Sequence, residues 1–147
     1  MNTPIKFRSL LLRCARMMSD EINVLLLPHQ LNYSLWQVLY TINIHGGCTS
    51  IQIAEYLNVS KPSIAKRIQV LMQLNVLQQI ETEDKRQKKL TLSPYGEELF
   101  EKCYKLVDQL EEQLIKEFDP ILIDQTNNFL LELTCKLETS KSGSIHD

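Results

Sequence analysis

Basic side chains gather in the middle of the 147-residue chain, at spacings that suit binding of an anion rather than catalysis. Residues 50–92 hold seven basic and four acidic groups (net +3), whereas residues 93–147 hold five and twelve (net −7). The whole chain carries only −2. The asymmetry indicates an acidic partner for the middle segment. Its basic residues are Lys61, Lys66, Arg67, Lys85, Arg86, Lys88 and Lys89.

Two short helices joined by a turn are predicted to position the first of these groups. Thr49 and Ser50 are residue types that begin helices, and Asn58-Val59 follows the first helix as a turn. Ser60 is a favoured N-cap for the second helix, with Pro62 in its first turn, where the missing N–H costs nothing. The pattern is typical of a helix-turn-helix, whose second helix is about as wide as the major groove of B-DNA.

Two alternating runs follow at once, Val76 to Glu81 and Lys88 to Leu92, around a charged turn. They predict a β-hairpin, or wing. A hairpin tipped with Arg86 can reach a minor groove, whose narrow stretches focus negative potential on an inserted arginine. Between the second helix and the first strand, Asn75 is expected to adopt the left-handed conformation that ends many helices.

The rest of the chain predicts further helices. Apolar residues recur at spacings of three and four over 5–27, over about 33–45, from 93 to 118 and from Pro120 onward, and a polar tail is expected from Ser140. The fold class is therefore mainly α with a small β-wing, a winged helix-turn-helix flanked by terminal helices.

These residues resemble a known family. The stretches Ile53 to Ser60 and Ser63 to Leu74, and above all the run from Asp84 to Gly96, are similar to the MarR family of bacterial transcriptional regulators. The Asp-x-Arg wing followed by Leu-Thr-Leu-Ser and a glycine is the most specific part. The resemblance implies one domain over 1–147. It places the winged helix-turn-helix lobe at about 33–96, the wing at about 77–92 and the dimerisation helices at about 5–30 and 97–139.

The resemblance also implies DNA-contacting residues. On the second helix, at the major groove and its flanking phosphates, they are Ser60, Lys61, Pro62, Ser63, Lys66 and Arg67. On the wing, Arg86 matches the arginine that enters the minor groove, Asp84 matches the acid that holds it, and Lys85 and Lys88 match backbone contacts. Family members often have Gly and Arg where this chain has Asn75 and Gln79, so any charged contact at position 79 is lost.

A regulator of this family is expected to bind a pseudo-palindromic double-stranded DNA operator as a homodimer, most often as a repressor. A small-molecule effector would act by binding one arrangement of the dimer more tightly. His29, Tyr33 and Trp36 are candidates to line an effector pocket, with plain core packing the competing interpretation, favoured for Trp36.

Three alternatives remain. Some family members sense peroxides through a cysteine in the first helix, so Cys14 is a redox candidate, although a buried structural thiol is the more common case. The lobe can also bind protein rather than DNA. An enzyme has the least support, because the sequence has no Gly-rich phosphate loop, no nucleophile elbow and no clustered His, Asp and Glu residues. No catalytic residue, cofactor or metal site is predicted, since His45 and Cys48 are too few ligands.

The four cysteines are widely spaced and fall among apolar residues, which favours buried free thiols. The first residues do not read as a signal peptide, because Arg13 and Arg16 interrupt the apolar run. No apolar run approaches the roughly 20 residues that span a bilayer. We therefore expect a cytoplasmic protein without membrane contact.

Overall fold

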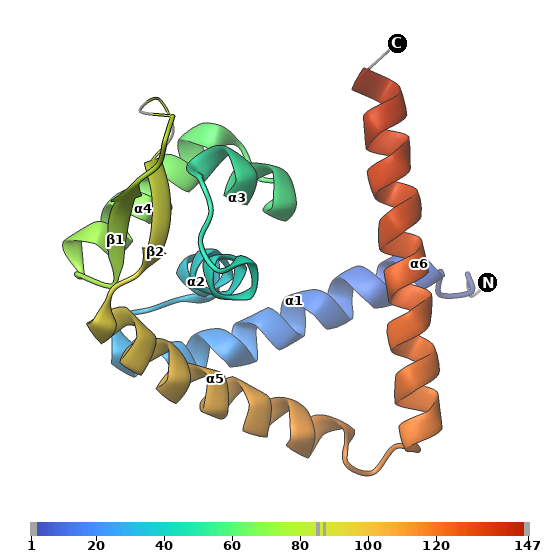
Figure 1. Ribbon diagram of the computed structural model, residues 1–147. Helices are drawn as coiled ribbons and strands as arrows, with labels where there is room; N and C mark the ends of the chain where they lie inside the picture. Colours follow the sequence, from blue (N-terminus) through green and yellow to red (C-terminus); the bar gives the residue numbers. More distant parts are fainter. Residues whose placement is uncertain (1–2, 85, 87, 146–147) are drawn as a thin grey trace. The chain divides into compact units, whose positions relative to one another are not determined.

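The computed structural model describes residues 3–84, 86 and 88–145, with side chains as far as Lys141. Figure 1 shows the helices and the hairpin that these residues form. The elements are α1 (Phe7–Leu26), the 3-10 turn η1 (Leu27–His29), α2 (Tyr33–His45), α3 (Ser50–Leu57), α4 (Lys61–Gln73), β1 (Leu77–Glu81), β2 (Lys88–Leu92), α5 (Pro94–Ile115) and α6 (Pro120–Ile145). This order confirms the predicted mainly α fold with a β-wing.

Local hydrogen bonds explain where the helices of the lobe begin. The Asn32 side chain accepts from Leu35 N at 2.8 Å at the start of α2. Thr49 and Gln52 form a reciprocal capping box at the start of α3. The Ser60 hydroxyl accepts from Ser63 N at 3.3 Å at the start of α4. Each cap satisfies an N–H that has no partner inside its helix.

Left-handed residues end the same helices. Gly46 (φ 68°) follows α2, Asn58 (φ 55°) follows α3, and Asn75 (φ 61°) lies just beyond α4. The prediction for Asn75 is therefore confirmed. Asparagine tolerates this conformation better than most residues because its short polar side chain bonds locally.

The wing is an antiparallel pair in which Leu77 lies opposite Leu92 and Glu81 opposite Lys88. An isolated antiparallel bridge joins Cys48, in the segment between α2 and α3, to Leu90 of β2. Gly47 (φ 115°) makes this approach possible, because a Cβ there would lie 2.7 Å from Lys89 Cε and 3.0 Å from Thr91 Cγ2. The bridge thereby holds β2 of the wing against the segment that joins α2 to α3.

The chain divides into two compact units, Met1–Asp108 and Gln109–Asp147. In the first unit α2 contacts α1, α3, α4 and β2, and Figure 1 shows it between α1 and α3. The core of this unit lies where these elements meet and includes Leu26, Leu39, Ile42, Ile53, Ile64, Leu71 and Val76, each at most 2% exposed.

The second unit holds the end of α5 and the whole of α6. The polar tail predicted from Ser140 is wrong as far as Ile145, because α6 continues to that residue. Helical backbone bonds do not require apolar side chains, and the Thr139 hydroxyl donates back to the Cys135 carbonyl at 2.9 Å, within the helix. Among the residues described, no helix has the length and apolar character that a membrane span requires.

Candidate nucleic-acid interface

The first turn of α4 presents polar and basic groups over an apolar underside. Ile64 and Leu71 are fully buried, and Ile53 of α3 is buried with them, so α3 and α4 share one core. On the other side Lys61 and Lys66 are exposed. A helix N-terminus has a partial positive charge and N–H groups without helical partners, so this face suits phosphate.

The residues predicted to form this face differ in their exposure to solvent. Ser60 and Pro62 are exposed and Ser63 is half-buried, its backbone used in the cap. Arg67 is half-buried, and its Nη1 donates to the Ser34 carbonyl and to Gln37 Oε1, both at 3.2 Å. Sequence analysis missed this link to α2, because partners 30 and 33 residues away leave no local pattern.

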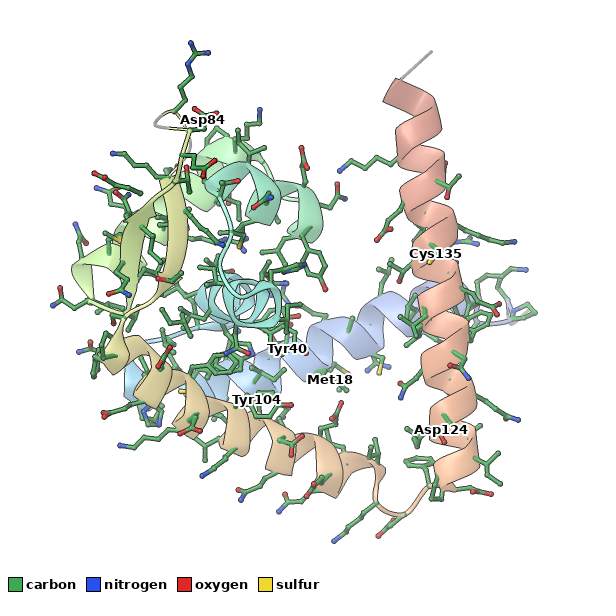
Figure 2. All side chains as sticks on the ribbon, in the orientation of Figure 1. Met18, Tyr40, Asp84, Tyr104, Asp124 and Cys135 are labelled. Atoms are coloured by element: carbon green, nitrogen blue, oxygen red, sulfur yellow. The ribbon has the colours of Figure 1, made fainter. Side chains whose placement is uncertain are left out.

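The wing tip is held by Asp84, which Figure 2 shows at the end of the hairpin. Its Oδ1 accepts from the backbone N–H of Arg86 at 3.0 Å, and the Thr82 hydroxyl donates to the Asp84 carbonyl at 2.8 Å. The acid therefore fixes the main chain at Arg86, which is exposed. Lys88 is also exposed. Lys85 lies outside the described residues.

A polar junction at the base of the wing connects the end of α4 to the start of α5. The Ser93 hydroxyl donates to the Asn75 carbonyl at 2.6 Å and accepts from Gly96 N at 2.9 Å, while Ser93 N donates to the Val76 carbonyl at 3.0 Å. A Cβ at Gly96 would collide with the Val76 carbonyl. The apolar pattern predicts a helix from residue 93, but it does not indicate these partners 17 and 18 residues earlier.

The three effector-pocket candidates occupy different environments. Trp36 is 5% exposed, and its ring stacks on Phe100 with 4.9 Å between centroids and 11° between planes. Core packing, the interpretation favoured for Trp36, is therefore confirmed. His29 and Tyr33 are half-buried at the junction between α1 and α2. Figure 2 labels Tyr40 and Tyr104, whose rings neighbour Trp36 and Phe100 and are partly exposed.

The cysteines divide into two pairs. Cys48 and Cys103 are buried, and burial raises the pKa of both thiols, with Lys89 and Lys102 opposing the shift. Cys14 and Cys135 are exposed in the single chain, so the prediction of burial is wrong for these two. Each lies on a helix with several exposed apolar side chains, α1 for Cys14 and α6 for Cys135. The described residues contain no group of three potential metal ligands.

An α3–turn–α4 pair with a shared core, followed by a two-stranded hairpin anchored at its base, defines a winged helix-turn-helix protein. Comparison with known proteins identifies its family. A sequence model of the MarR family matches residues 29–87. The chain is 33% identical over 104 residues to the uncharacterised HTH-type transcriptional regulator YwoH of Bacillus subtilis strain 168, a match that covers 71% of this chain and 76% of the relative. The chain belongs to the MarR family.

Other relatives agree with this placement. An uncharacterised HTH-type transcriptional regulator of Staphylococcus aureus strain Mu50 is 36% identical over 89 residues, covering 59% of this chain and 60% of the relative. The S. aureus MarR structure in complex with salicylate and kanamycin has a TM-score of 0.80 and 26% identity, with 89% of each chain covered. The S. aureus MepR–DNA complex also has a TM-score of 0.80, at 18% identity and with 91% and 99% covered, and shows the same fold.

Proposed function

We propose that this chain is a transcriptional regulator that binds a pseudo-palindromic DNA operator as a homodimer and acts as a repressor. The observation that carries the proposal is one lobe that exposes Lys61 and Lys66 at the capped start of α4 and Arg86 at a wing tip fixed by Asp84. Two such lobes in a dimer would meet successive major-groove faces of one duplex. The relative solved with DNA supports this mode of action.

The proposed contacts follow from the sequence positions and from exposure. At the start of α4 they are Ser60, Lys61, Pro62, Ser63 and Lys66; on the wing they are Asp84 (through Arg86), Lys85, Arg86 and Lys88. Arg67, which the family resemblance places with the first group, is half-buried and bonded to α2, and it is not proposed as a contact. Phosphate contacts by the lysines would supply most of the affinity, and the wing arginine would read the width of the minor groove.

Removal of the wing arginine tests the proposal. Arg86→Ala should lower operator affinity by about tenfold, within the 1–3 kcal/mol typical of one groove contact. Binding of the wild type should fall steeply between about 50 and 200 mM salt. The measurement is a titration of genomic fragments selected for binding, with Lys105→Ala on the exposed side of α5 as the matched control. Unchanged affinity in Arg86→Ala would refute the wing assignment. If the wild type shows no salt-dependent binding to DNA, the alternative of a protein-interaction module is favoured.

We further propose that a small molecule controls DNA binding and that the protein acts in the cytoplasm, without a cofactor and without catalysing a reaction. A relative crystallised with salicylate and kanamycin supports a small-molecule effector. His29, Tyr33 and Trp36 remain the proposed pocket residues, of which Trp36 belongs to the core. Screening small molecules for release of bound operator fragments would identify the effector.

A further inference from the structure

The first turn of α2 receives polar contacts from two different helices. From α1, Asn23 Oδ1 accepts from Tyr33 N at 2.6 Å. From α4, Arg67 Nη1 donates to the Ser34 carbonyl and to Gln37 Oε1, both at 3.2 Å. All these residues lie within the unit Met1–Asp108. The first turn of α2 therefore connects the helix with an exposed apolar stripe, α1, to the helix predicted to read DNA, α4.

Arg67 differs from its neighbour Lys66 in how its charge is used. Lys66 is exposed, whereas Arg67 is half-buried and its Nη1 donates to two acceptors on α2. A guanidinium holds its donors in a fixed plane, so two such bonds set the orientation of α4 as well as its distance from α2. A lysine ammonium is a compact point charge and does not impose that geometry.

We propose that Arg67 is a positioning residue that fixes the orientation of the recognition helix against α2, and through Tyr33 and Asn23 against α1, rather than a phosphate contact. The proposal rests on the DNA-binding function proposed above. In a homodimer joined through the terminal helices, the orientation of α4 relative to α1 sets the separation of the two recognition helices. Arg67 and Gln37 would therefore determine which half-site spacing the dimer accepts.

Variants that keep or remove charge separate the two roles. Gln37→Ala changes no charge, yet should lower affinity for the correctly spaced operator several-fold and weaken discrimination against operators with one base pair added or removed. Arg67→Ala, which also loses the bond to the Ser34 carbonyl, should have at least the same effect. Adding Gln37→Ala to it should cause no further loss, because the bond between the two side chains is already broken. Gln37→Glu keeps an acceptor for Arg67 and should retain the wild-type spacing preference. Lys66→Ala, the matched control, should reduce the salt slope by about 0.9 and leave that preference intact.

The measurement is a fluorescence anisotropy titration of each variant against the operator spacing series at several salt concentrations, with thermal unfolding of the free proteins to confirm that each is folded. Arg67→Ala with a slope reduced by about 0.9, together with a silent Gln37→Ala, overturns the inference and makes Arg67 a phosphate contact. Full retention of affinity and spacing preference in Arg67→Lys overturns it as well. Wild-type protein that fails to bind DNA overturns the proposed function itself, an outcome distinct from either of these.

Discussion

The winged lobe and the first helix differ in the burial of their apolar side chains. In the lobe, Ile53 and Ile64 are fully buried by other parts of the same chain. Along α1, Leu10, Met17 and Val24 recur every seven residues and are 54%, 55% and 65% exposed. A helical repeat of seven places these three on one stripe, the pattern of a helix packed along another helix. One chain completes the lobe but leaves this stripe of α1 uncovered.

The α6 helix resembles α1 in this respect. As far as Lys141 it contains no buried side chain, and Leu122, Phe129 and Leu137 are 49%, 50% and 63% exposed. Exposed apolar surface repeated along a helix marks an interface in a protein that functions in water. In the proposed dimer, the lobe that would contact DNA has its core within one chain, whereas the helices that would join two lobes have exposed apolar stripes.

The largest effect is expected from a charge on the α1 stripe. Leu10→Asp should convert the dimer to a monomer, since a carboxylate buried between apolar helices costs several kcal/mol. Operator affinity should then fall by about 10²- to 10⁴-fold, because the two half-sites are no longer bound by one linked molecule. Sedimentation equilibrium measures the mass and anisotropy measures the affinity.

The control for that experiment is Ser9→Asp, which adds the same charge at the adjacent exposed polar position. It should remain dimeric, and an acidic residue in the first turn of a helix is slightly favourable. If Leu10→Asp stays dimeric and binds as the wild type does, α1 is not the interface and the contrast with the lobe fails.

A smaller effect is expected within the lobe, at the junction of α4 and α5. Gly96→Ala should lower the free energy of unfolding by about 3 kcal/mol, the upper end for an overpacked site, because the new Cβ collides with the Val76 carbonyl and the backbone must shift. The comparison is Gly46→Ala, where no atom lies within 4 Å of the added Cβ and only the left-handed φ of 68° is unfavourable, at about 1–2 kcal/mol.

Chemical denaturation followed by circular dichroism measures both variants. If the two variants are equally destabilised, the backbone at the junction can shift to accommodate the added Cβ. The close approach of Gly96 to Val76 would then not be a fixed part of the lobe. In the expected case, Gly96→Ala loses the larger amount even though its own backbone conformation is ordinary for alanine.

Features set by neighbouring residues were predictable from sequence. The Ser60 cap and the left-handed Asn75 each depend on residues a few positions apart, and the two alternating runs mark the strands of the hairpin; the structure contains all three features. The bonds from Arg67 to Gln37 and from Ser93 to Asn75 were not predictable. They join residues 30 and 18 positions apart and depend on how whole helices pack. The sequence shows that Arg67 is basic, but the direction of its guanidinium is decided by the fold.

The smallest effect tests the same contrast through thiol reactivity. Cys14 lies four residues after Leu10 and three before Met17, so a dimer that covers the α1 stripe should also shield it. A maleimide should therefore label Cys14 several-fold more slowly in the wild type than in Leu10→Asp, as followed by mass spectrometry of peptides.

Cys48 and Cys103 should label slowly in both proteins, because burial raises the pKa of each thiol and lowers its thiolate fraction. The labelling rates of these two thiols should rise with pH. Cys135 lies on α6 and should change in the same direction as Cys14, so a small-molecule thiol serves as the reference. Equal rates for Cys14 in the two proteins would show an open thiol in the native assembly, the condition that a peroxide-sensing Cys14 requires.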